Sequence, residues 1–152
     1  MGASSDLEFK GFLTELLSNV DYSELITVER EVPHIRPMVY VNRGLTIYMA
    51  SLRGANKVKQ IKANPHVSVI IKTFKEDKEN NEIIVEGLAD FVSDPSEREW
   101  VFSAFKSKPL TFQEWAEDGS SAEYEVIRIV PRLIKYFDYT QGESAPRVLE
   151  VL

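Results

Sequence analysis

From residue 23 onward, short runs of β-branched and aromatic residues are separated by turn signals, and this pattern constrains the fold more than any other feature of the chain. We predict strands at residues 25–28, 35–41, 45–50, 66–74, 82–92, 124–129 and 133–139. Because these runs do not alternate strictly with helices, antiparallel pairing is favoured over a doubly wound parallel sheet. We therefore expect a mainly β, α+β fold in which six to seven antiparallel strands form a small barrel with helices attached.

Turn and helix signals place the connections between the strands. The Asn-Arg-Gly sequence at residues 42–44 predicts a hairpin between the strands at 35–41 and 45–50, and the polar residues 75–81 predict another. Helices are predicted at residues 6–20, between Gly-Ala-Asn at 54–56 and Asn-Pro at 64–65, from Asp94-Pro95 onward, and at residues 111–117. Residues 1–5 are expected to be disordered, and residues 140–152 are expected to form a tail without a clear period.

Length, charge and cysteine content limit the class of protein. The 152 residues, of which 43% are hydrophobic, fit a single domain spanning residues 1–152. With 24 acidic and 18 basic residues the formal charge is −6, so binding to nucleic acid or to an anionic membrane is not expected. The absence of cysteine excludes disulfides, thiolate nucleophiles and cysteine-ligated metals. The chain shows neither a signal peptide nor an apolar run of membrane-spanning length, so we expect a cytoplasmic protein.

Self-contained catalytic motifs are missing from the sequence. It has no Gly-x-Ser-x-Gly elbow, no phosphate-binding Gly-x-x-x-x-Gly-Lys loop, no Gly-x-Gly-x-x-Gly and no His-Glu-x-x-His. The two histidines, His34 and His66, fall on different predicted strands without carboxylates at ligand spacing, which favours a surface position over a metal pair. The acidic residues of the 75–82 loop are better explained as a solvated turn than as an acid–base pair. We therefore expect no catalytic side chain and no metal site.

The distribution of charge is the most informative feature. No Asp or Glu occurs between residues 32 and 75, although the same stretch contains Arg36, Arg43, Arg53, Lys57, Lys59, Lys62, Lys72 and Lys75. Chance clustering or a solvated helix face would explain part of this pattern. The alternative is an anion site, because a predicted helix begins near Asn56-Lys57 and its free N–H groups and dipole favour a phosphate. Arg36, on a neighbouring strand, would then supply a bidentate partner.

Apolar residues near this basic segment offer a surface for an organic ring. Met38, Tyr40, Tyr48 and Met49 lie at strand-alternating positions, where core packing is the default explanation. The residues on the other face of the pleat are the ones that would line a flat heteroaromatic ring.

Five blocks of the chain carry a resemblance to a known family. They are residues 33–41, 45–51 and 56–69, the last containing Lys-x-x-x-Ile-x-x-Asn-Pro-x-Val, followed by residues 84–89 and 126–138. In this order, with the Arg-x-Met-Val sequence at residues 36–39, they closely resemble the pyridoxamine 5′-phosphate oxidase-like flavoproteins. The general stress protein-like branch is the most similar, and the resemblance extends from residue 9 to residue 139.

The resemblance implies a split β-barrel that forms a homodimer, with an FMN in each of two clefts built by both subunits. It implies that Arg36 and Lys57 hold the FMN phosphate, that Met38 and Val39 border the isoalloxazine ring, and that Ser51 contacts the phosphate or the ribityl chain. The complete set of implied cofactor contacts is Arg36, Pro37, Met38, Val39, Ala50, Ser51, Asn56 and Lys57.

Several positions depart from the pattern of the oxidases. Ala55 and Asn56 replace a serine and an arginine next to the phosphate, and Glu82 stands where the oxidases place a flavin-contacting glutamine. Val41 replaces a lysine that reads the vitamin substrate, and the C-terminal Arg-x-His becomes Arg-Val-Leu at residues 147–149. The resemblance therefore implies a flavoprotein that is not a true pyridoxamine phosphate oxidase.

Three functions remain open at this point. The leading one is an FMN-binding oxidoreductase in which the flavin supplies the redox chemistry. The second keeps the fold and changes the ligand to a deazaflavin, haem or a related molecule. The third is a non-enzymatic, flavin-binding stress protein. The sequence does not name the substrate, the electron donor or the electron acceptor.

Overall fold

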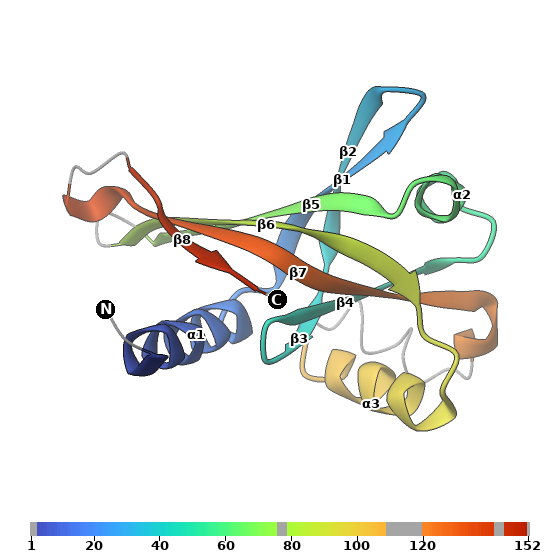
Figure 1. The fold of residues 1–152 in the computed structure, drawn as a ribbon. Helices are drawn as coiled ribbons and strands as arrows, with labels where there is room; N and C mark the ends of the chain where they lie inside the picture. Colours follow the sequence, from blue (N-terminus) through green and yellow to red (C-terminus); the bar gives the residue numbers. More distant parts are fainter. Residues whose placement is uncertain (1–2, 76–78, 109–119, 142–144, 152) are drawn as a thin grey trace.

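The fold, taken from a computed structural model that describes residues 3–75, 79–108, 120–141 and 145–151, is a mainly antiparallel α+β arrangement (Figure 1). The helices are α1 (Ala3–Ser18), α2 (Asn56–Ala63) and α3 (Pro95–Phe105), with 3-10 turns η1 (Ser120–Glu123) and η2 (Tyr139–Gln141). The strands are β1 (Tyr22–Glu29), β2 (Val32–Val39), β3 (Val41–Arg43), β4 (Thr46–Leu52), β5 (His66–Lys75), β6 (Glu79–Phe91), β7 (Tyr124–Asp138) and β8 (Arg147–Glu150).

The strands form one curved sheet. Their order along it is β2-β1-β5-β6-β7-β4-β3, and β8 pairs with β7 outside this path. The two ends of the path, β2 and β3, are separated in the chain by Tyr40 alone, so the sheet must bend back on itself. This curvature gives the split-barrel architecture that the sequence resemblance implied, and the expected fold class is confirmed.

Alternating burial along the strands places the core on the inner face of the sheet. In β1, Ser23, Leu25 and Thr27 are buried whereas their neighbours are half-buried or exposed. One hydrophobic cluster joins this face to Phe9, Leu13 and Leu17 of α1. Both α1 and α3 lie below the long strands in Figure 1, but they pack on opposite faces of the sheet, because Met49 and Ile127 join the cluster with α1 whereas their neighbours Tyr48 and Val126 join the cluster with α3.

A second cluster fixes α3. Its buried residues include Val101, Phe102 and Phe105 of the helix and Tyr48 and Val126 of the sheet. The helix begins as predicted, because the Asp94 carboxylate accepts a hydrogen bond of 2.9 Å from the Glu97 N–H and Pro95 occupies the first turn.

The predicted hairpin between residues 35–41 and 45–50 is largely wrong. Residues 32–39 form β2, which pairs along its whole length with β1, and only β3 pairs with β4. The β1–β2 turn consists of Arg30 and Glu31, which both adopt positive φ values of 49° and 65°. Two-residue hairpin turns need this conformation, but neither residue type favours it, so the sequence carried no visible turn signal.

The two predicted closing strands at 124–129 and 133–139 are one continuous strand, β7. Pro131 does not break it, because the pairing register with β6 shifts between Glu86 and Gly87. A side chain at Gly87 would collide with the backbone carbonyl of Val130, so this irregular crossing requires a glycine.

The chain ends are more regular than expected. Helix α1 begins at Ala3, so the expectation of disorder is wrong for residues 3–5, while residues 1–2 lie outside the described residues. Within the expected tail, η2 and β8 are regular. The helix predicted at 111–117 falls outside the described residues. Among the helices described, none has the length and apolarity needed to cross a membrane.

Candidate functional site

Arg36 lies where β2, β1 and α2 meet. Its Nη1 donates to the Thr27 hydroxyl at 2.9 Å and to the Leu25 carbonyl at 3.3 Å, and its Nη2 donates to Gln60 Oε1 at 2.9 Å. Burial of the half-exposed guanidinium lowers its pKa from the usual value. None of its three acceptors is charged, so the positive charge of Arg36 is not neutralised by these contacts.

Lys57 is the second residue of α2 and is half-buried. Its pKa is lowered, first by burial of the ammonium and second by the positive charge of Arg36. Within the described part of the chain, Lys57 has no hydrogen bond or ion pair. Arg36 and Lys57 are therefore two neighbouring cations without a carboxylate partner, which is the electrostatic arrangement of an anion site.

The start of α2 adds backbone donors beside Lys57. The N-cap residue, Ala55, has an extended conformation and makes no side-chain cap. The first N–H groups of a helix have no acceptor within the helix, so those of Asn56 and Lys57 remain available to an anion. The Asn56 side chain itself is exposed.

Ser51 and Ala50 lie at the end of β4, which leads into α2. The Ser51 residue is 5% exposed, yet its hydroxyl makes no hydrogen bond to any residue that the structure describes. Ala50 is half-buried against the second hydrophobic cluster. The Ser51 hydroxyl is therefore free to bond water or a ligand.

Pro37, Met38 and Val39 follow Arg36 on β2. Met38 is 9% exposed and belongs to the core, and its carbonyl accepts a 2.9 Å hydrogen bond from the Ser23 hydroxyl. Val39 packs on the second cluster, whereas Pro37 is exposed. Tyr40, Tyr48 and Met49 are also buried, so the default expectation of core packing for these aromatic and Met residues is confirmed.

The eight implied contacts thus fall on three segments: β2, the end of β4 and the start of α2. Among these contacts, Arg36 and Lys57 are close enough for the charge of Arg36 to lower the pKa of Lys57. Two further residues at this point, Thr27 and Gln60, were not predicted. Gln60 lies three positions after Lys57 and therefore on the same face of α2, which is the signal that would have pointed to it.

The histidines lie on different strands, as predicted, but one of them has an acidic neighbour. His34 Nε2 on β2 is 3.8 Å from Glu29 Oε2 on β1. The β1–β2 hairpin, which was not predicted from the sequence, brings these two residues together. Within the described residues no group of three potential ligands gathers around a metal position.

The largest cluster of ion pairs has a structural role. Arg128 on β7 binds Asp90 at 2.6 Å and Glu97 at 2.7 Å, and the Tyr48 hydroxyl donates to Glu97 at 2.7 Å. The hydrogen bond from Tyr48 and the contacts with Arg128 lower the pKa of Glu97 despite partial burial. Burial and the Glu97 contact raise the pKa of Tyr48 to about 12. Glu97 stays ionised, and the cluster ties α3 to the sheet.

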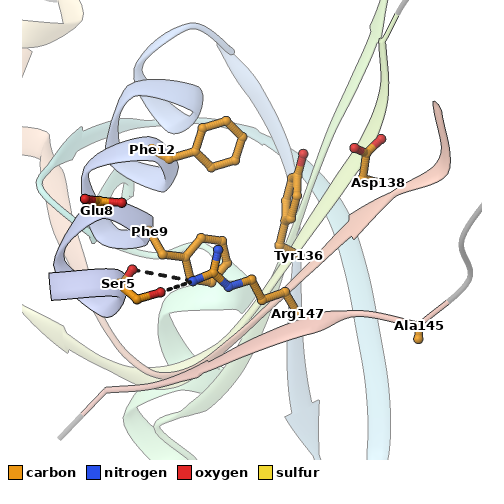
Figure 2. A pocket seen from close by; sticks show the side chains of 8 residues that line it. All are labelled: Ser5, Glu8, Phe9, Phe12, Tyr136, Asp138, Ala145 and Arg147. Atoms are coloured by element: carbon orange, nitrogen blue, oxygen red, sulfur yellow. Dashed lines mark hydrogen bonds between the residues drawn. The ribbon is translucent and has the colours of Figure 1, made fainter. Parts of the chain in front are cut away.

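A separate pocket of about 510 Å³ lies at the other end of the molecule, beside the start of α1 (Figures 1 and 2). Figure 2 shows Phe9 and Phe12 projecting from α1 toward Tyr136, with Arg147 reaching across from β8. The Arg147 guanidinium lies 3.8 Å from the centre of the Phe9 ring and donates to the Ser5 hydroxyl at 3.3 Å. None of the eight implied cofactor contacts lines this pocket.

Comparison with known proteins agrees with the curved sheet. The family described as pyridoxamine 5′-phosphate oxidase matches residues 12–138. The chain belongs to this oxidase-like family. General stress protein 26 of Bacillus subtilis is 23% identical over 95% of the chain and 97% of its own length, in agreement with the stress-protein branch of the family.

Solved structures share the fold, and the descriptions of two of them name different ligands. General Stress Protein 26 from Bacillus anthracis is 24% identical with a TM-score of 0.71, covering 95% of this chain and 99% of its own. An FAD binding protein from Mycobacterium smegmatis is 18% identical with a TM-score of 0.64, covering 91% and 95%. A heme binding protein from the same organism is 13% identical with a TM-score of 0.74, covering 99% and 59%.

Proposed function

We propose that the chain binds FMN, with the phosphate at Arg36 and Lys57, and acts as a flavin-dependent oxidoreductase. The observation that supports this most strongly is that two half-buried cations lie together without a carboxylate partner among the described residues. A phosphate dianion would relieve both the repulsion between these charges and the cost of their burial.

The donors at the site match the chemistry of a phosphate monoester. Lys57 offers an ammonium, the Arg36 Nε–H has no partner within the described residues, and the start of α2 has no side-chain cap. The hydroxyl of Ser51, which has no hydrogen bond to a described residue, would add one more. The residues present therefore fit the phosphate end of FMN.

This chain would contribute binding and orientation, while the flavin would supply the electron transfer. Among the residues that the structure describes, no carboxylate or histidine contacts Arg36 or Lys57 directly, so no acid–base residue is assigned. The changes at Ala55, Asn56, Val41 and Glu82 support a reaction other than the oxidation of pyridoxamine phosphate.

We also propose a homodimer that uses the outer face of the sheet. The outward residues of β1, β5, β6 and β7 include the row Glu24, Ile70, Ile84 and Lys135, which are neighbours in register. Ile70 and Ile84 are only half-buried and belong to neither hydrophobic cluster. A pocket of about 570 Å³ lies next to this row, and Ile26, Leu88 and Leu133 are among its lining residues. Side chains of a second copy would pack into this pocket.

Reconstitution tests the proposed ligand. Purified protein is incubated with FMN, FAD or haem in separate samples, excess ligand is removed, and the absorption spectrum and stoichiometry are recorded. We expect one FMN per chain and its reduction by a reduced nicotinamide. Retention of haem but not of flavin would contradict the proposal and favour the second ligand class, which the heme binding relative represents. Binding of FMN without reduction would favour a non-enzymatic flavin protein.

A further inference from the structure

Gln60 of α2 is a buried polar residue, 6% exposed, whose side chain meets Arg36. We propose that Gln60, together with Thr27, is a positioning residue that holds the Arg36 guanidinium in place through neutral contacts and so keeps its charge available to the phosphate. This inference rests on the proposed function of the site and extends it to residues that do not touch the ligand.

The three side chains form a closed set of hydrogen bonds. Gln60 Oε1 accepts from Arg36 Nη2 at 2.9 Å and from the Thr27 hydroxyl at 2.6 Å. The Thr27 hydroxyl in turn accepts from Arg36 Nη1 at 2.9 Å. Thr27 is fully buried. Because one end of the guanidinium is bonded to Thr27 and the other to Gln60, and these two are bonded to each other, its plane is fixed and less rotamer entropy remains to be lost when a ligand binds.

Glu29 determines which way the Gln60 amide points. Gln60 Nε2 donates to Glu29 Oε2 at 3.3 Å, so the amide oxygen is the atom directed at Arg36 and Thr27. The reversed amide would direct N–H groups at the guanidinium donors and leave the carboxylate without its donor. Glu29 therefore acts on Arg36 only through a neutral amide and does not pair with it.

The chemical identity of residue 60 then controls the charge of the site. Glutamine and glutamate have nearly the same shape and helix propensity, so a carboxylate would fit the helix equally well. At residue 60, however, a carboxylate would form a charge-assisted pair with Arg36 and offset the positive charge that attracts a phosphate. Lys57 and Gln60 lie one turn apart on α2. This helix therefore carries one cation of the site, Lys57, and also the side chain that positions the other cation, Arg36.

The test compares FMN with riboflavin, which has the same ring but no phosphate, on the full chain. Dissociation constants are measured for the wild type and for Gln60→Leu, Gln60→Glu and Thr27→Val, and folding is checked by chemical unfolding. We expect Gln60→Leu and Thr27→Val to weaken FMN binding about tenfold and Gln60→Glu to weaken it about a hundredfold. Riboflavin affinity should stay the same in all three variants.

A second comparison isolates the route through Arg36. In an Arg36→Ala background, Gln60→Leu should cause no further loss of FMN affinity, since the residue it positions is gone. Equal losses for FMN and riboflavin, or an additive loss in the double variant, would show a purely structural role and overturn the inference. Wild-type FMN affinity in the Gln60→Glu variant would also overturn the inference. If the wild type itself does not prefer FMN to riboflavin, the phosphate site fails and the inference fails with it.

Discussion

At the scale of single residues, the proximity of two positive charges, Arg36 and Lys57, distinguishes this site from the rest of the basic segment. Arg53 is bound to Glu125 at 2.9 Å, whereas the contacts of Arg36 are all neutral. A cation already bound to a carboxylate gains little from a phosphate, because the ligand must displace the existing partner. Arg43, Lys59, Lys62 and Lys72 also make no ion pair with a described residue, but they are exposed. Unpaired charge that is half-buried, rather than basic composition, therefore marks the site.

Removing either cation should weaken FMN binding. Arg36→Ala and Lys57→Ala are each expected to cost about 1.5–3 kcal/mol of binding free energy, the range for charge-assisted hydrogen bonds. Lys59→Ala is the matched control, because Lys59 is exposed on the same helix and its loss changes the net charge equally. Calorimetric titration with FMN measures all three variants. An equal loss in the control would mean that a general electrostatic field, and not a phosphate site, is responsible.

The sequence points to the charged members of the proposed site but not to the neutral residues that contact Arg36. Arg36 and Lys57 stand out in the sequence because no acidic residue occurs near them. Thr27 and Gln60 carry no such signal, because a neutral polar residue is informative only when its partners are known. Those partners come from β2 and β1, and their pairing was not predicted.

At the scale of elements, local signals succeeded where one residue type decides the geometry. Asp94-Pro95 predicted the start of α3, and Asn64-Pro65 the end of α2, because caps and proline act within a few residues. The sequence did not predict the β1–β2 turn or the continuity of β7, because both depend on pairing between strands.

The irregular crossing of β6 and β7 makes a prediction of its own. Gly87→Ala should destabilise the protein by about 1–3 kcal/mol, because the new methyl group would meet the Val130 backbone and the strands would have to separate. Gly54→Ala is the control, since no atom lies within 4 Å of the position of its Cβ. Denaturant unfolding measures both variants. Equal stability of the Gly87 and Gly54 variants would show that the two strands can move apart at little cost.

At the scale of the whole molecule, the curvature of the sheet assembles the site. Tyr40 connects β2 to β3, so the strand that carries Arg36 is joined to the strand that pairs with β4, where Ser51 lies. The same curvature directs Ile70 and Ile84 outward, away from α1 and the core. The proposed dimer surface lies on β1, β5, β6 and β7, next to β2, which carries Arg36.

Disrupting the outer face should dissociate the proposed dimer. Ile84→Lys places a charge beside Lys135, its neighbour on β7, at the centre of that face. We expect sedimentation velocity to show a monomer and FMN affinity to fall, because the family resemblance implies a cleft built by two subunits. Leu7→Lys is the control, because Leu7 is 71% exposed on α1 and lies off this face. If Ile84→Lys remained a dimer, the dimer interface would have to lie on another surface.

A crystal structure of the protein grown with FMN examines the phosphate anchor directly. We expect the phosphate oxygens to lie within hydrogen-bonding distance of the Arg36 guanidinium, the Lys57 ammonium and the first N–H groups of α2. Gln60 should still be bonded to Arg36. Density for FMN in another part of the molecule, such as the aromatic pocket beside Phe9 and Tyr136, with Arg36 and Lys57 contacting only solvent, would contradict this expectation.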